Sequence, residues 1–299
     1  MQQTLPAPRA MLGTGSTPAG RGRWALVRRL RQNRGAVVGF ALLAVVIALA
    51  LAAPLVTTHD PIKINPPDRN LGPSPEHWMG TDQFGRDVFT RVVYGARISL
   101  PVGLIAVAIA AVVGTVLGLL AGYYGRLVDG AVMRVIDIML AFPGILMALV
   151  VVAILGASLQ NVMIAVGISE IPRYTRLVRG SVLSARENLY VDAARITGLR
   201  DAAILFRHIL PNVVGPMVVL ATLSVGSAIL AAAGLSFLGL GAQPPRPEWG
   251  AMLADGRQFL GSHWWIATMP GFAIALTVLA INMAGDGLRD VLDPRLQSR

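Results

Sequence analysis

The chain contains no cysteine, a single lysine and few charged side chains for its length. The absence of cysteine excludes disulfide bonds and thiolate metal sites. Charged residues make up 14% of the 299 residues, whereas soluble globular proteins carry about 25%. A chain this poor in charge cannot cover a soluble surface. Together with its mean hydropathy of +0.61, this composition predicts an all-α integral membrane protein.

The single lysine argues against a nucleotide-hydrolysing site in this chain. A Walker A loop needs a lysine beside its glycine-rich turn, because that lysine reaches the phosphates. Lys63 lies in the stretch DPIKINPP, with no glycine nearby. We therefore expect a chain that is not an enzyme and that binds no cofactor of its own.

Histidine is also scarce, and its four positions are far apart in sequence: His59, His77, His208 and His263. No two of them have the spacing of a metal-ligand pair, so no metal site is predicted. The acidic stretch Asp82–Asp87 does not fit the spacing of an EF-hand calcium loop. We expect a packed, salt-bridged outer loop there, or a helix that lies along the membrane surface.

The basic residues do not form one patch. The net charge of +10 comes from arginines that flank apolar runs, so nucleic-acid binding is not predicted. Seven of these arginines precede the first apolar run. No cleavage signal follows, which favours a retained first membrane helix over a removed signal peptide.

Five runs without Asp, Glu, Lys, Arg or His are long enough to cross a bilayer, which takes about 20 apolar residues. They are Gly35–Thr58, Ile98–Gly125, Ile138–Ser169, Ile209–Pro245 and Trp264–Gly285. The third run is long for one helix, and the turn-prone stretch Gly156–Asn161 divides it. In that reading one helix ends near Leu155 and the next begins near Val162, so the sequence allows five or six transmembrane helices.

The distribution of basic residues decides between these two counts, because cytoplasmic loops carry an excess of Lys and Arg. With six spans and a cytoplasmic N-terminus, the inside segments hold 19 basic residues and the outside segments hold 7. With five spans, the inside segments hold 11 and the outside segments hold 15. We therefore predict six transmembrane helices with both termini in the cytoplasm. The basic segment Arg173–Arg207 then lies inside the cell as well.

This inner segment has the pattern of a folded element. Val182–Thr197 has the periodicity of one helix, with Leu189, Ala193 and Ile196 on a common face. Gly198 is placed to end that helix in the left-handed conformation.

A second short helix is expected directly afterwards. Asp201 is placed to cap it, and Pro211 is expected to break its pattern. On these residues alone, the segment is either a solvated loop that fixes topology or a docking element for a cytosolic partner.

The stretch DAARITG…HILP resembles the EAA loop of permease subunits of bacterial importers of the ATP-binding-cassette (ABC) type. That loop reads Glu-Ala-Ala, three residues, Gly, nine residues, Ile, one residue, Leu-Pro. The matching positions are Asp192, Ala193, Ala194, Gly198, Leu210 and Pro211. Asp192 replaces the Glu, which shortens the arm of a salt bridge to the partner, and His208 replaces the first Ile.

Further stretches extend the resemblance over about residues 28–296. They are GTDQFGRDVFTRVVYGARISL, IDIMLAFPGILMALV, YTRLVRG, GLSFLGLGAQPPRPEWGAML and AGDGLRDVLDPRL. Each is similar to part of the second permease subunit of dipeptide and oligopeptide importers. The resemblance implies a type I ABC importer permease fold in the bacterial inner membrane.

The resemblance also implies a set of partners. The permease would pair with a homologous permease, and two cytosolic ATPase subunits would bind ATP and Mg²⁺ and dock on the EAA loops. An extracytoplasmic binding protein would deliver di- or oligopeptides. Related systems carry nickel complexes, glutathione or other small solutes, so these stay alternatives.

The predicted organisation has four parts. The first two are a flexible cytoplasmic tail over 1–22, and a region over 23–97 that contains the first transmembrane helix and the outer loop. The third is an importer transmembrane domain of five helices over 98–290, with its coupling loop at about 173–211. The last is a cytoplasmic tail over 291–299.

Two further sets of residues are candidates for function. Glu170 precedes Pro172 in the inner half of the fourth predicted helix, where a carboxylate needs a partner. It is predicted either to pair with Arg173 or to act as a gate or substrate-amine contact. Arg246 and Glu248 lie in an outer loop and are candidate contacts for the binding protein.

Two other classes of membrane protein are competing interpretations. An ion-coupled secondary transporter normally has an ion site within the membrane and an internal repeat, and the sequence offers no repeat. A membrane-embedded enzyme needs a nucleophile beside a base, and the sequence offers no such group of residues.

Overall fold

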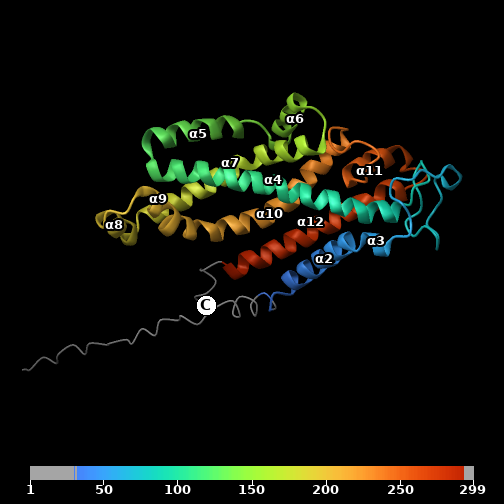
Figure 1. Ribbon diagram of the computed structural model, residues 1–299, viewed down its shortest axis with the longest axis horizontal. Coiled ribbons are helices and arrows are strands. Elements are labelled where there is room, and N and C mark those ends of the chain that lie inside the picture. Colours follow the sequence, from blue (N-terminus) through green and yellow to red (C-terminus); the bar gives the residue numbers. More distant parts are fainter. Residues whose placement is uncertain (1–29, 31, 293–299) are drawn as a thin grey trace, which may run out of the picture.

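The computed structural model describes residue 30 and residues 32–292, and it is built of helices joined by turns and one long loop (Figure 1). The helices are α2 (Arg34–Leu51), α3 (Ala53–Val56), α4 (Val88–Tyr124), α5 (Arg126–Leu140), α6 (Gly144–Leu155), α7 (Leu159–Arg186), α8 (Leu189–Ile196), α9 (Asp201–Ile204), α10 (Leu210–Phe237), α11 (Trp249–Gly256) and α12 (Trp265–Leu292). Short 3-10 turns cover Pro66–Asp68 and Arg257–Phe259, and a π-turn covers Leu205–Ile209. The only β geometry in the described residues is an isolated bridge. The predicted all-α class is therefore confirmed.

Among the described residues, four helical stretches are long and apolar enough to cross a bilayer. They are Arg34–Leu51, Val88–Tyr124, Asp201–Phe237 and Trp265–Val291. The pair α5 and α6, bent by 94°, is a fifth candidate. A sixth span requires α7, which has 28 residues but carries too many charges to qualify alone. The count of six therefore stays a prediction.

The third predicted helix, Ile138 to Leu155, is wrong as a single element. The chain bends at Pro143, between α5 and α6, because a proline disfavours helical geometry in the residue before it. The residues between the second and third apolar runs are helical as well, because they form most of α5. The predicted break at Gly156–Asn161 is confirmed, because Ser158 caps α7 by accepting from the Asn161 backbone N–H at 3.1 Å.

α4 begins at Val88, well before Ile98, where the uncharged run starts. The run without charges begins directly after Arg97, and α4 also contains Arg91, whose side chain is only 3% exposed. Its guanidinium donates to the Pro61 carbonyl at 2.8 Å and lies 3.5 Å from the Asp82 carboxylate. The long loop thus satisfies the buried charge of Arg91. The surface helix, one of two alternatives for Asp82–Asp87, is not formed: these residues are a loop, and α4 begins directly after them.

α4 and α7 form the most extensive helix pair of the described chain. Three glycines of α4, one turn apart, face three bulky residues of α7, also one turn apart: Gly114, Gly118 and Gly122 against Tyr174, Val178 and Val182. A Cβ on Gly118 would lie 2.7 Å from the Cβ of Val178. The two backbones thus approach so closely that only glycine fits on α4.

α2 packs antiparallel against α12 through another close approach. A Cβ on Gly39 would lie 2.6 Å from the backbone nitrogen of Ala284. Near their ends, the Asn33 amide donates to the Asp290 carboxylate at 3.0 Å. Asn33 and Asp290, near the two ends of the described residues, therefore lie side by side. That both termini are cytoplasmic stays a prediction, because the tail 1–22 and residues 293–299 of the tail 291–299 lie outside the described residues.

Gly118→Ala is expected to lower the stability of the chain by about 1–3 kcal/mol, the usual cost of overpacking. The matched control is Gly130→Ala in α5, where a Cβ meets no atom within 4 Å. There alanine favours the helix by about 0.5–1 kcal/mol. Thermal unfolding of the purified assembly measures both variants, and equal melting temperatures would contradict the close packing of α4 on α7.

Candidate functional site

The predicted helix Val182–Thr197 is in fact two helices. α7 ends at Arg186 and α8 begins at Leu189. Between them, the Asn188 amide donates to the carbonyls of Ser184 and Ala185, both at 3.0 Å. These two bonds satisfy carbonyls that the end of α7 leaves without helical partners, and the chain can therefore change direction here.

α8 ends as predicted, at a glycine. Gly198 has φ +78°, and its N–H donates to the Arg195 carbonyl at 2.9 Å. The Leu199 N–H donates to the Ala194 carbonyl at 3.2 Å. These two bonds are the pair that defines a Schellman motif, and they confirm the predicted tight turn after α8.

The predicted cap at Asp201 is wrong. This carboxylate makes no capping bond to α9; it accepts instead from the Tyr123 hydroxyl of α4 at 2.6 Å. Pro211 does not end the helix either: it lies in the first turn of α10, directly after the π-turn. α9, the π-turn and α10 thus form one helical stretch from Asp201 to Phe237.

The two alanines of the EAA-like motif point to different sides of α8. Ala194 is only 6% exposed and packs with Val191 in the core at this end of the molecule. Ala193 is exposed, and on the same face Leu189 and Ile196 are 85% and 86% exposed. The predicted common face is therefore an apolar surface without a partner within the described chain.

The second half of the motif lies beside the first. The Asn212 amide of α10 donates to the Tyr190 hydroxyl of α8 at 3.2 Å and to the His208 carbonyl at 2.7 Å. His208 and Leu210 are half-buried, and Pro211 is exposed. Asp192 is about half exposed and pairs with Arg195 at 3.5 Å.

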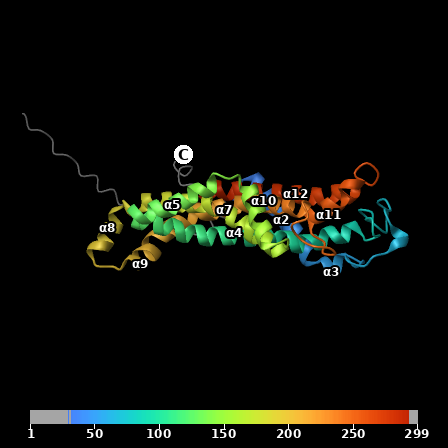
Figure 2. The same ribbon diagram turned by 90° about the horizontal axis from the view of Figure 1, so that it is seen from above.

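All of these groups gather at one end of the molecule. α8 and α9 lie at this end, and the long loop before α4 lies at the other (Figures 1 and 2). A cavity of about 660 Å³ opens at the α8 end, and α7, Tyr190 and Asn212 are among its lining. This loop between α7 and α10 is the coupling-loop candidate.

The charges of α7 are met by ion pairs. Glu170 pairs with Arg173 at 3.3 Å, which is one of its two predicted roles; the gate stays a prediction. Further along the helix, Arg179 holds Asp129 of α5 through two bonds, one of them 2.6 Å long. Pairing of this kind allows a charged helix to lie among apolar ones.

The outer loop before α12 corrects one predicted site residue. Glu248 is only 3% exposed, because it caps α11 by accepting from the backbone N–H groups of Gly250 and Ala251 at 3.0 and 2.8 Å. A direct contact with a binding protein is therefore not available to it. Arg246 is exposed, so its contact stays a prediction.

The predicted salt-bridged loop is confirmed, and its outward side stays a prediction. The Arg86 guanidinium donates to the Asp82 carboxylate at 2.6 Å, and both side chains are buried. Burial raises the pKa of the nearby Asp255 carboxyl, while Arg86 and Arg91 act in the opposite direction. Asp87 caps α4 by accepting from the Thr90 N–H at 2.7 Å.

The fold and the coupling-loop candidate define a class of membrane transport component, and comparison with known proteins identifies the family. Residues 114–298 match the model of the binding-protein-dependent transport system inner membrane component. Residues 22–73 match the N-terminal transmembrane domain of oligopeptide transport permease C. The chain therefore belongs to the family of binding-protein-dependent inner-membrane permeases.

Curated relatives match over most of the chain. A dipeptide transport system permease protein DppC from Alkalihalophilus pseudofirmus is 54% identical, over 91% of this chain and 89% of its own length. A glutathione transport system permease protein GsiD from Pectobacterium atrosepticum is 48% identical, over 91% and 90%. A di/tripeptide transport system permease protein from Pseudomonas aeruginosa is 45% identical, over 89% and 90%.

A solved structure supports the fold. The inward-facing MetNI methionine ABC transporter matches with a TM-score of 0.54 and 20% identity, over 68% of this chain and 97% of its own. The fold is thus that of a type I ABC importer permease. The chain is a multi-pass inner-membrane protein, and membership of its family implies that it works with ATPase subunits and a substrate-binding protein.

Single cysteines separate the two outer-loop candidates, because the natural chain has none. Arg246→Cys is expected to react with a membrane-impermeant maleimide added to the outer side, and to crosslink to the binding protein. Glu248→Cys is expected to stay unlabelled until the chain unfolds. Labelling of Glu248→Cys in the folded protein would contradict its burial, and a failure of Arg246→Cys to crosslink would remove it from the interface.

Proposed function

We propose that this chain is the permease subunit of an ATP-driven importer of di- and oligopeptides. It forms half of the membrane pathway and pairs with a homologous permease. Two cytosolic ATPase subunits supply the hydrolysis, and an external binding protein supplies the peptide. The 54% identity to a dipeptide permease over 91% of the chain is the observation that supports the substrate class best.

The exposed face of α8 is the proposed docking surface for an ATPase subunit. Leu189, Ala193 and Ile196 present an apolar patch that costs free energy in water and is stabilised when a partner covers it. The Gly198 turn and the Asn212–Tyr190 bond hold α8 in a fixed orientation. The patch is therefore preorganised, which lowers the entropy cost of docking.

The link from α8 to the membrane pathway runs through three contacts. Asn212 joins α8 to α10 through its bond to Tyr190. Tyr123 of α4 donates a hydrogen bond to Asp201, just after the Gly198 turn. The Arg186 guanidinium at the end of α7 donates to the Gly122 carbonyl of α4 at 2.9 Å. A displacement of α8 by closing ATPase subunits would therefore move α4, α7 and α10 together.

Ile196→Asp is expected to weaken ATPase binding by at least about tenfold, the loss of one interface hot spot. The matched control is Ile62→Asp, which changes another exposed isoleucine in the loop at the opposite end. Co-purification of the ATPase subunits and ATP-dependent uptake are measured for both. Equal ATPase recovery from the two variants would contradict docking on α8. Ala194 is not a suitable position for testing ATPase docking, because its side chain is buried within this chain and its replacement would disturb the fold.

Glutathione is the second candidate cargo, because the GsiD relative is 48% identical over a similar length. The whole transporter in liposomes, with its binding protein, distinguishes the two. We expect dipeptides and short oligopeptides to stimulate ATP hydrolysis and to accumulate inside, while glutathione does neither. Stimulation by glutathione alone would reassign the cargo and leave the permease role intact.

A further inference from the structure

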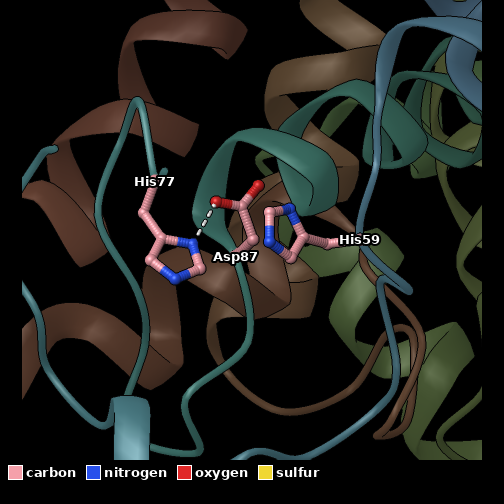
Figure 3. Close-up of side chains that lie close together, drawn as sticks. All are labelled: His59, His77 and Asp87. Atoms are coloured by element: carbon pink, nitrogen blue, oxygen red, sulfur yellow. Dashed lines mark hydrogen bonds and ion pairs between the residues drawn. The ribbon is translucent and has the colours of Figure 1, made fainter. Parts of the chain in front are cut away.

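The long loop before α4 brings together three side chains that are distant in sequence. His59, His77 and Asp87 each offer one ligand atom, and these atoms all lie within 4.8 Å of one another. Figure 3 shows the two imidazole rings on either side of the carboxylate. Sequence spacing predicted no such group, because the loop must fold back on itself before the residues meet.

The two residues at the centre of the group are buried and correctly spaced for an ion. His77 is 6% exposed and Asp87 is 4% exposed, and the His77 Nδ1 lies 3.0 Å from the Asp87 Oδ1. Two ligand atoms on one tetrahedral zinc ion are separated by roughly 3.3 Å, given metal–ligand bonds of about 2.0–2.1 Å. The pair is therefore close to a coordinating geometry, with a hydrogen bond where an ion would bind.

The third ligand comes from a side chain that is free to move. His59 is exposed, and its ring centroid lies 4.9 Å from that of His77. Its ring bonds only the neighbouring Thr58 hydroxyl, at 3.2 Å. A shift of roughly 1.5 Å would bring its nitrogen to coordinating distance.

The surroundings complete the site. When His77 binds an ion through Nδ1, its Nε2–H faces the Asp68 carboxylate, now 3.9 Å away, and Asp68 is itself held by the Asn65 amide. A carboxylate behind a coordinating histidine is the usual outer shell of a zinc ligand. A cavity of about 460 Å³ adjoins all three ligands and is also lined by Glu76, which leaves room for a water molecule or Glu76 as fourth ligand.

We propose that His59, His77 and Asp87 form a binding site for a borderline divalent cation such as Zn²⁺ at the outer end of the permease. Two imidazoles and one carboxylate suit zinc, whereas Mg²⁺ and Ca²⁺ take oxygen ligands almost alone. The ion ties the chain just after α3 to the residue that caps α4, because the second Asp87 oxygen accepts from the Thr90 N–H. The bound ion thus fixes the loop before α4 to α4 itself.

The test uses the whole transporter, purified through a tag without histidine, stripped with EDTA and titrated with Zn²⁺. We expect His59→Gln to bind Zn²⁺ at this site at least tenfold more weakly than the wild type. At zinc concentrations that fill only the wild-type site, the wild type should therefore bind one more ion than the variant. The matched control is His263→Gln, which removes a histidine from another loop and should bind like the wild type. His59 is exposed, so its replacement leaves the fold intact.

Two further readouts make the outcome decisive. Zinc should raise the melting temperature of the wild type and of His263→Gln, but not of His59→Gln, and equal concentrations of Mg²⁺ should not substitute. Identical zinc stoichiometry and affinity in His59→Gln and the wild type would overturn the proposal, since the ions would then bind elsewhere. No bound zinc in the wild type would overturn it as well.

Discussion

The close approach of α4 and α7 is the constraint on which the rest of the structure depends. Gly114, Gly118 and Gly122 remove every side chain from one face of α4, so the larger residues of α7 rest directly on its backbone. In a bilayer, lipid tails are as apolar as the side chains, and helix association therefore depends on this kind of tight packing. α7 is not among the helices that are long and apolar enough to span a bilayer alone, and it packs closely against α4, which is.

The charges that weaken α7 as a span are the ones that connect it to its neighbours. Arg179 binds Asp129 of α5, and Arg186 binds the backbone of α4. Directly beyond Arg186 the chain turns into α8, the proposed docking helix. The end of α7 is therefore less apolar than its start, but Arg179 is paired and Arg186 is hydrogen-bonded, and both bonds fix α7 to its neighbours at the point where α8 begins.

Sequence patterns predicted the class, the break before α7, the Gly198 turn and the exposed face of α8, since each depends on local composition or helical periodicity. They failed where a distant partner decides the outcome. Arg91 lies outside every apolar run of the sequence, yet it is buried in α4, where the Pro61 carbonyl accepts from its guanidinium. Asp201 was assigned to its own helix, yet Tyr123 binds it. Pairings between residues so far apart in sequence leave no periodic signal.

α4 joins the two functional ends of the molecule. It has 37 residues, which corresponds to about 55 Å of helix, more than the roughly 30 Å of a hydrocarbon core. Its first turn is capped by Asp87 within the outer loop, and its last turn carries Tyr123, which binds the segment that follows α8. α4 thus connects the loop before it to the segment that follows α8 through one continuous helix. The glycine face of α4 packs α7 directly against the same helix.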